Sequence, residues 1–511
     1  MAPVATSSDR VLPQAEVTQA GLPHPGFSFD VAQFAPEKST WKMPSWARVD
    51  GQKSYKEEDL PKTNGLGDHW DFRKPTIKGI DLTKLDDRVV IPRREMAGTD
   101  PNSKILFQDV NILDSTGREP FRGDVLVVGE KIRYVGQVPD NEKQGSRVIK
   151  GNGRTLMSGL VDAHTHFTWT NAGNLDSLAT MGVEEHTLFS ARSARTFLDC
   201  GYTMCFGAAS AKERIDTVLR NAIYDNEIPG PRFLANGMEM APRDGALVAG
   251  ITSYADTDEE AIEQVKLHIA TGVDNVKLSM SGEEITETIR AEDTVFKDSM
   301  VYNAIETAHA AGKRVCGHAR SDESIMQCLQ YGVDVIYHAS FISDATMDAL
   351  EVQKDRVFVA PAINWLIATL NDAVAFGYTF SKAESVGYKR ELEVALKGLQ
   401  EMRRRGIKVL PGGDYGFAWC PHGTQRDLEH FVNLMGYSPM EAIIAATAWG
   451  GELMGQPNEL GLVKPGYYAD LLLVDGNPLE DISLLSKHGK HLDMVLINGR
   501  VHKQLAKDSS A

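Results

Sequence analysis

The chain has 511 residues, too many for one small domain, and 42% of them are hydrophobic while 24% are charged. This composition is close to the globular average, which excludes a collagen-like, wholly disordered or membrane-embedded protein. The 54 basic and 70 acidic residues give a formal net charge of −16, which argues against a general affinity for nucleic acid or anionic membranes and leaves open an enzyme for a neutral or cationic small molecule.

The first 103 residues are rich in Pro, Lys, Asp and Ser and lack sustained periodicity, which predicts an irregular extension. This extension nevertheless contains several large aromatic residues, namely Trp41, Trp46, Trp70 and Phe72. They are too many for a solvated tail. We therefore expect the extension to lie against the body of the protein or against another subunit, and the protein to be a homo-oligomer.

From Lys104 the pattern changes to short runs with β-branched residues and Gly or Asp breaks, which predict strands joined by tight turns. These runs are KILFQDVNILD, DVLVVGEKIRYVGQV and SRVIKGNGRTLMSG. A similar texture returns near the other end, in GLVKPGYYADLLLVDGNPL and HLDMVLINGRVHK. We expect residues 104–158 and 462–511 to pair into one small β-domain, because both segments alternate apolar and polar residues.

Between these ends, residues 159–461 alternate short apolar runs with helix-patterned stretches such as ESIMQCLQYG. The runs are TMCFGA, RFLAN, NVKLSM, RVCGHA, VDVIYHA, RVFVAPA and KVLPGGD. This alternation predicts an α/β fold with a parallel sheet, and eight such units form a TIM-like (β/α)8 barrel. The barrel is favoured over a doubly wound sheet because the chain has no glycine-rich phosphate fingerprint. In a barrel, the strand C-terminal ends meet on the face where catalytic residues usually lie.

Several of these runs end in residues that bind metals. His164 and His166 lie two residues apart in SGLVDAHTHFTW, so in an extended strand both project from one side and can bind one ion. His318, His338 and Asp414 end RVCGH, VDVIYH and KVLPGGD. Each alone could be a core histidine or a helix N-cap. Their coincidence at successive strand ends predicts a site for zinc, manganese, cobalt or iron.

Lys277 lies at the end of another apolar run, NVKLSM. A lysine in a buried strand is unfavourable unless it is paired or neutralised. One alternative is a stem buried along the barrel with the ammonium reaching a carboxylate. The other is carbamylation by carbon dioxide, which gives a carboxylate that bridges two metal ions.

A third group of residues near strand ends consists of candidates for substrate binding. Trp169, Trp365, Trp419 and His422 could line an apolar pocket, with core packing as the alternative for the tryptophans. Arg320 could bind a carboxylate or carbonyl of the substrate, and so could Arg243. A surface ion pair is the alternative for both arginines.

In order along the chain, GLVDAHTHF, NVKLSMSG, CGHAR, IYHAS, GGDYG and PGYYADLLLVDGNPLEDI resemble the amidohydrolase superfamily over residues 104–503. The stretch that begins GGDYGFAWCPHGTQ is similar to the imidazolonepropionase-like and prolidase-like branch, which includes molinate and phenylurea hydrolases and ochratoxin-type amidases. This resemblance implies a metal-dependent barrel at residues 159–461. It also implies that residues 104–158 and 462–511 form a β-sandwich.

The resemblance further implies two divalent metal ions per chain, with zinc favoured over cobalt, manganese or iron, and carbon dioxide for lysine carbamylation. The ligands carried over are His164, His166 and Asp414 for one ion, His318 and His338 for the other, and carbamylated Lys277 between them. A bound metal lowers the pKa of water to about 7 and polarises a carbonyl, so no nucleophilic side chain is required. Asp414 would accept the proton of that hydroxide-forming water and pass it to the departing nitrogen.

We therefore expect a hydrolase that cleaves an amide, carbamate, thiocarbamate or urea bond of a small, partly apolar molecule. A mononuclear deaminase of an amino-heterocycle is the main alternative, and it predicts one metal ion, ammonia release and an unmodified Lys277. Deaminases tend to place a glutamate three residues after the fifth-strand histidine, whereas Ala319, Arg320 and Ser321 follow His318 here. A non-catalytic relative would be expected to have lost ligands, and none is missing.

Two further expectations concern location and substrate handling. The five cysteines are widely spaced, and the chain lacks a signal-like start and any run of about 18 apolar residues, so we expect reduced thiols, a cytoplasmic location and no membrane partner. The histidine-bearing loop after the third strand of several dipeptidase relatives is absent, because residues 236–244 are NGMEMAPRD.

Overall fold

The computed structural model describes residues 95–245, 247–286, 289–486 and 488–505, together with a short antiparallel pair, β1 (Thr76–Ile77) and β2 (Ile80–Asp81). Apart from that pair, the first 94 residues lie outside the described residues. The predicted contact of Trp41, Trp46, Trp70 and Phe72 with the body or with another subunit therefore stays a prediction.

Parallel strands alternating with helices make up the middle of the chain, which confirms the predicted α/β class. Three strands form one sheet in the order β10-β9-β8: β8 (Leu160–Thr165), β9 (Tyr202–Gly207) and β10 (Arg232–Leu234). Six form a second sheet in the order β12-β11-β13-β14-β15-β16: β11 (Glu239–Ala241), β12 (Thr252–Tyr254), β13 (Asn275–Ser279), β14 (Arg314–Ala319), β15 (Val335–His338) and β16 (Phe358–Ala360). Short strands β11 and β12 were not predicted.

The edges of these two sheets are joined by isolated backbone contacts. They are the parallel bridge Asn236–Asn275, the parallel bridge Val359–Val409, and a hydrogen bond of 2.9 Å from Ala163 N to Pro411 O. The first bridge joins Asn236, which follows β10, to Asn275 at the start of β13, and the other two contacts place the run KVLPGGD between β16 and β8.

KVLPGGD pairs with β16 and β8 through isolated contacts and does not form a regular strand, so the strand predicted here is formed only in part. Pro411 has no N–H to donate to a ladder. Gly412 follows it, and a Cβ there would lie 2.6 Å from the backbone nitrogen of His164. Only a glycine allows this close approach, and the segment therefore lies tightly against β8 at His164 before it reaches Asp414.

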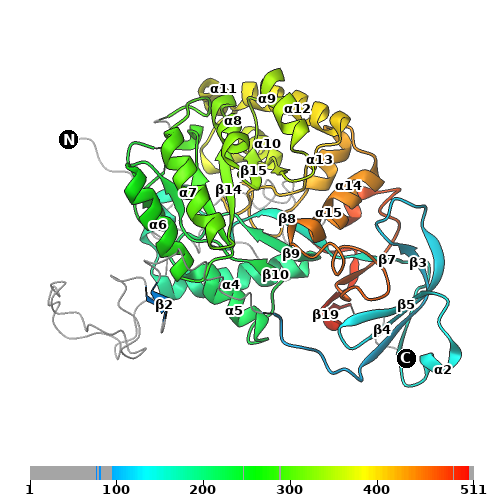
Figure 1. Cartoon of the computed structure of the whole chain (residues 1–511). Helices are drawn as coiled ribbons and strands as arrows, with labels where there is room; N and C mark the ends of the chain where they lie inside the picture. The colour runs from blue at the N-terminus through cyan, green and yellow to red at the C-terminus, as the bar shows by residue number, and fades with distance from the viewer. Residues whose placement is uncertain are drawn as a thin grey trace, which may run out of the picture.

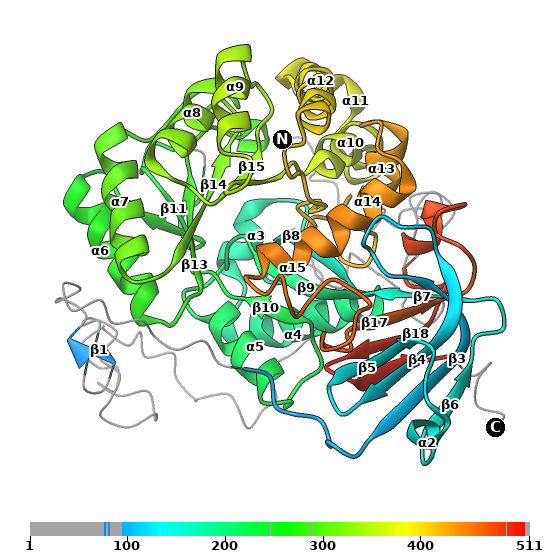
Figure 2. The same ribbon diagram turned by 45° about the vertical axis from the view of Figure 1, so that its right-hand side comes forward.

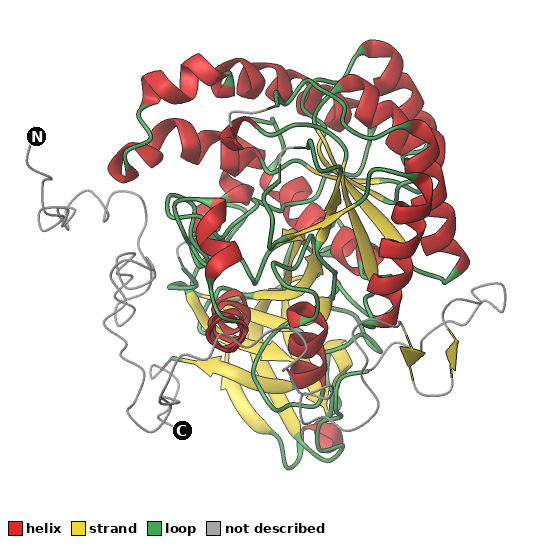
Figure 3. Ribbon diagram, turned by 90° about the vertical axis from the view of Figure 1, so that its left-hand side faces the viewer, coloured by secondary structure: helices red, strands yellow, loops and turns green. Residues whose placement is uncertain are grey.

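The helices lie around the outside of the strands (Figures 1 and 3). They are α3 (Leu175–Thr180), α4 (Val183–Asp199), α5 (Ile215–Tyr224), α6 (Asp258–Ala270), α7 (Asp298–Ala310), α8 (Asp322–Tyr331), α9 (Asp344–Val352), α10 (Ile363–Asn371), α11 (Phe380–Val386), α12 (Tyr388–Arg405), α13 (Asp427–Asn433), α14 (Pro439–Ala446) and α15 (Ala448–Leu453), with 3-10 turns η6 (Glu284–Thr286), η7 (Ala373–Phe376) and η8 (Ile482–Leu485). Side-chain caps begin several of them: Ser321 starts α8 and Ser343 starts α9, each accepting a backbone N–H. These caps fix where each strand–helix connection ends.

Segments from both ends of the described chain form a mixed eight-stranded sheet (Figure 2). Its elements are β3 (Lys104–Leu113), β4 (Phe121–Val128), β5 (Lys131–Gly136), β6 (Arg147–Lys150), β7 (Thr155–Ser158), β17 (Leu471–Val474), β18 (Leu492–Ile497) and β19 (Arg500–Gln504), with the short helix α2 (Asp140–Lys143). Antiparallel pairing of β17 with β7 joins the late segment to the early one. The buried pair of Arg232 with Asp470, 2.7 Å apart, ties this sheet to β10.

The five cysteines are free and buried. Within the described ranges, no helix combines the length and the apolar character needed to cross a membrane.

Candidate metal centre

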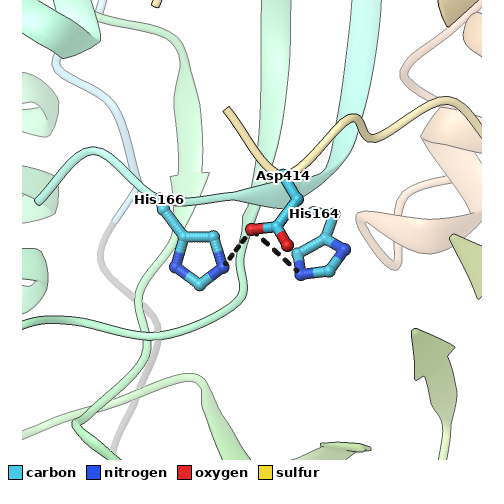
Figure 4. A group of neighbouring side chains, drawn as sticks. All are labelled: His164, His166 and Asp414. Carbon is cyan, nitrogen blue, oxygen red and sulfur yellow. Dashed lines mark ion pairs between the residues drawn. The ribbon is translucent and has the colours of Figure 1, made fainter. Parts of the chain in front are cut away.

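His164 and His166 lie at the C-terminal end of β8, where Asp162 fixes the backbone. The Asp162 carboxylate accepts the N–H of His164 at 3.0 Å and the hydroxyl of Thr165 at 2.8 Å. Both imidazoles turn their Nε2 atoms toward Asp414 (Figure 4). The distance to Asp414 Oδ1 is 3.2 Å from His166 and 3.7 Å from His164. Three ligand-type atoms from two distant segments thus face one another.

Asp414 reaches this position through an unusual backbone conformation. Its φ of 57° is in the left-handed region, which few residues other than Gly, Asn and Asp adopt readily. Burial alone would raise the pKa of its carboxyl, but the neighbouring His164, His166 and Lys277 outweigh burial and hold that pKa below its usual value. The carboxylate is therefore ionised at neutral pH, as a metal ligand must be.

The donor set fits a divalent cation. Ligand atoms of His164, His166 and Asp414 lie within 4.8 Å of one another, and two ligands of a tetrahedral zinc ion lie about 3.4 Å apart when each bond is about 2.1 Å. His166 Nδ1 is 3.2 Å from the Ala209 carbonyl. Since a carbonyl only accepts, Nδ1 carries the proton and Nε2 keeps its lone pair. Metal-binding histidines are commonly oriented in this way.

His318 and His338, at the ends of β14 and β15, lie next to this group. Their ring centroids are 4.4 Å apart, and the His338 ring is 5.2 Å from that of His164. His318 Nε2 donates to the Gly282 carbonyl at 3.1 Å, which leaves the lone pair on Nδ1. Burial lowers the pKa of His164, His318 and His338, so the rings are neutral, the form that binds metals. All five predicted histidine and aspartate ligands are therefore brought together.

Lys277 is buried at the centre of β13, with 1% of its surface exposed. Its Nζ lies 3.3 Å from Glu239 Oε1 and 4.5 Å from the centroid of the Tyr337 ring. Tyr337 in turn stacks on His164 at 3.9 Å. The carboxylate partner foreseen in one of the two alternatives for Lys277 is thus present, and it is Glu239 of β11.

The predicted pocket residues lie in two places. Trp169 is next to the candidate centre, where its ring stacks on His166 at 4.1 Å. Trp365 and Trp419 pack with Phe417 at ring distances of 4.6 and 5.7 Å, and only 2% and 5% of their surfaces are exposed. They form a buried aromatic cluster beside the site and present little surface to a ligand.

His422 lies behind His166 and does not face it ring to ring. Its Nε2 donates to the His166 backbone carbonyl at 2.9 Å, and its own N–H donates to Asn171. Burial lowers the pKa of His422 to about 3, so the ring is a neutral donor that holds the His166 backbone in place.

Arg320 is fully buried, so the surface ion pair considered for it is wrong. Its guanidinium pairs with Glu283 on one side and with Glu391 on the other. Burial raises the pKa of Glu283 to about 7; Arg320 opposes this, and the charges of Glu391 and Asp414 add to it. Arg243, in contrast, is exposed and pairs with Asp256 and Glu260 on the surface.

Sequence reasoning missed Glu239, Glu283 and Glu391. Glu239 lies between two methionines in NGMEMAPRD, so a carboxylate in an apolar run was the signal that could have identified it. Glu283 follows the Lys277 strand by four residues, but Glu391 is on α12, more than a hundred residues further on. Its proximity to Arg320 depends on helix packing that no local pattern encodes.

Comparison with known proteins adds a family to this geometry. Residues 155–502 match the protein-family model that is described as "Amidohydrolase family". The chain is similar to an ochratoxinase of Aspergillus niger, with 26% identity over 422 residues, covering 77% of this chain and 85% of the relative.

Solved structures show the same fold. A Xaa-Pro dipeptidase with bound methionine in the active site has a TM-score of 0.67 and 23% identity, covering 78% of this chain and 100% of the other. A molinate hydrolase has a TM-score of 0.63 and 18% identity, covering 79% and 95%.

Proposed function

The chain belongs to the amidohydrolase family, and from this premise we propose that it hydrolyses a carbon–nitrogen bond of a small, partly apolar molecule in a metal-dependent reaction. The substrate class is an amide, carbamate, thiocarbamate or urea. The observation that carries the proposal is the convergence of His164 Nε2, His166 Nε2 and Asp414 Oδ1 at neighbouring strand ends.

The side chains divide the chemical work among themselves. When bound, a divalent ion supplies Lewis acidity, which makes water more acidic and a carbonyl more electrophilic. Asp414 is positioned to accept a proton from the attacking water at Oδ1 and to deliver it to the departing nitrogen. Hydrogen bonds to His422 and to the Ala209 carbonyl orient His166, and the Trp169 ring stacks on one face of the His166 ring. These contacts fix the orientation of the His166 ring toward Asp414.

The proposal includes two metal ions per chain, with zinc preferred. It also includes carbon dioxide, which would carbamylate Lys277 when the site forms. His318 and His338 would hold the second ion. The neutral Lys277 amine would add through Nζ to the carbon of carbon dioxide and release one proton, which Glu239 is placed to accept, and the resulting carbamate would offer its carboxylate as a further ligand. Support comes from the burial of Lys277 and from its place beside Tyr337, which stacks on His164.

The fold proposal follows from the edge contacts. The bridges at Asn236 and Val409 and the bond to Pro411 link the parallel strands into a ring, which supports a (β/α)8 barrel at residues 159–461. The eight-stranded sheet of both ends supports a β-sandwich domain of residues 104–158 and 462–511. Residues 1–103 are the proposed extension of a homo-oligomeric cytoplasmic protein.

A product screen in heavy-oxygen water tests the reaction. Zinc-loaded protein is incubated with amides, carbamates, ureas and amino-heterocycles, and mass spectrometry locates the label. Cleavage into an amine and a labelled acid or carbonate-type fragment, lost in Asp414→Asn, is expected. Exchange of a ring amine for labelled oxygen without fragmentation would instead establish a deaminase and overturn the proposal.

A further inference from the structure

A second layer of polar residues follows the candidate ligands on three neighbouring strands. Glu283 comes after β13, Arg320 after β14 and Ser340 after β15. The Arg320 guanidinium lies between Glu283 and Glu391 and pairs with both. Ser340 donates to Glu391 Oε1 at 2.6 Å, and Tyr388 donates to Glu283 Oε1 at 3.0 Å. Each carboxylate is therefore held by a charged and a neutral donor.

The two carboxylates differ in exposure. The side chains of Arg320 and Glu391 are 0% and 1% exposed, whereas that of Glu283 is 12% exposed. Of this trio, Glu283 alone reaches the accessible surface to a meaningful extent. Arg320 and Glu391 therefore form the buried base on which the Glu283 carboxylate is mounted.

Glu283 also lies on a loop that contacts a candidate ligand. The carbonyl of the preceding residue, Gly282, accepts the hydrogen bond from His318 Nε2. Ser281 of the same loop accepts the backbone N–H of Arg320 at 2.9 Å. The Asp414 charge is close enough to contribute to the raised pKa of Glu283. The loop thus sets a carboxylate beside the reacting centre without making it one of the predicted ligands.

The charge of the trio determines what this carboxylate can recognise. One guanidinium carries a single positive charge, so Arg320, Glu283 and Glu391 together carry one net negative charge when all are ionised. Negative charge at a largely desolvated position is unfavourable until a cation approaches it. A cation beside Glu283 would also favour its ionised form. The overall charge of −16 increases the local concentration of cations in the same direction.

We propose that Glu283 is a specificity-determining residue that binds a protonated amine of the substrate next to the scissile carbon–nitrogen bond. Arg320 and Glu391 are positioning residues that hold the Glu283 carboxylate. The substrate class is therefore a small amide that carries a primary ammonium group. This inference rests on the proposed function, because it places the ammonium relative to the bond that the centre would cleave.

Matched substrates test the inference. 4-(Aminomethyl)acetanilide and 4-(hydroxymethyl)acetanilide differ by an ammonium in place of a hydroxyl, and kcat/KM is measured for each with the zinc-loaded protein. We expect the cationic anilide to be preferred by about 10- to 100-fold, the range of a hydrogen bond to a charged group. Glu283→Gln should abolish the preference, measured as the ratio of the two kcat/KM values within the one protein. Equal kcat/KM values in the wild type, or an undiminished preference in Glu283→Gln, would overturn the inference.

Two further measurements keep the inference separate from the proposed function. The control Glu292→Gln removes a carboxylate that pairs with Arg290 and Arg390 on the surface, and it should retain the full preference. Binding of benzylamine and of benzyl alcohol is measured by calorimetry, which requires no turnover. If neither anilide is cleaved but benzylamine binds at least tenfold more tightly to the wild type than to Glu283→Gln, the anilide activity fails and the inference about Glu283 stands. If the neutral anilide is cleaved and benzylamine binds equally well to the wild type and to Glu283→Gln, the inference about Glu283 fails and the proposed function stands.

Discussion

Gly412→Ala tests whether the close approach of the 411–414 segment to β8 positions Asp414. The added Cβ would lie 2.6 Å from His164 N and 2.8 Å from His164 Cβ, while ordinary contacts begin at 3.4 Å. The two segments must therefore separate by about 0.8 Å, the difference between 3.4 and 2.6 Å. Because the opposing atoms include backbone, no rotamer change relieves the clash, and we expect a loss of about 1–3 kcal/mol in the free energy of unfolding.

The same displacement acts on the site. Asp414 follows Gly412 by two residues, and the hydrogen bond from Ala163 to Pro411 precedes it. A shift of about 1 Å in a reacting group can cost about 100-fold in rate, so kcat should fall by about that factor and zinc content should decrease. Urea denaturation, steady-state kinetics and metal analysis measure the three effects. Gly173→Ala is the control, since nothing lies within 4 Å of its Cβ position. A Gly412→Ala protein with wild-type stability, zinc content and kcat would refute the argument.

Four other predictions follow from the described contacts and from the extension. Lys277→Ala should lose one metal ion and its activity, both restored by a short carboxylic acid; retained metal content and turnover, by elemental analysis and assay, would contradict the carbamate. Arg320→Met leaves the buried Glu391 and the partly buried Glu283 without their guanidinium and should cost about 3–5 kcal/mol, whereas the exposed Arg243→Met should cost no more than about 1 kcal/mol in the same urea titration. The folded-state pKa of Glu283, about 7 against the usual 4.5, means that the folded protein binds more protons between those values. Its contribution to the free energy of unfolding is therefore full below pH 4.5 and falls by about 3 kcal/mol as pH rises to 7; if wild type and Glu283→Gln show the same pH dependence, that pKa is wrong. A variant beginning at Asn102 should have a smaller solution mass per particle by light scattering than loss of the extension alone explains, and an unchanged oligomer would count against the extension as a subunit contact.

Local sequence patterns predict most strands of the parallel sheets and the position of each candidate ligand. Runs such as RVCGH and VDVIYH are short, apolar and bounded by helical segments, so the strand and its polar last residue can be identified together. Since parallel strands share one C-terminal edge, placing His318 beside His338 requires no further information. The distance of 4.4 Å between the two ring centroids agrees with that inference.

Contacts that depend on packing between distant segments could not be predicted. Glu391 of α12 pairs with Arg320, which follows β14, and accepts a hydrogen bond from Ser340, which follows β15. Lys277 and Glu239 meet because the three-residue strand β11 adds to the edge of β13, and so short an element leaves no periodic signal. In KVLPGGD the sequence predicted more regular structure than is present. Its apolar start resembles a strand, but Pro411 cannot donate a hydrogen bond to a regular ladder.

Several residues at the strand ends that form the site have a strained backbone conformation. His338, Ala339, Ala362 and Asp414 have φ values between 51° and 69°, although none is glycine. Such left-handed positions cost about 1–2 kcal/mol each for most residues, and they persist when the surrounding structure requires them. His338 and Asp414 are candidate ligands, and Ala339 directly follows one of them. An extended continuation of β15 would send the next side chains to alternate faces, whereas the left-handed turn ends the strand and leaves His338 directed at His164. The backbone strain at these few residues therefore lowers stability, and in return it directs the donor atoms of His338 and Asp414 toward the same site.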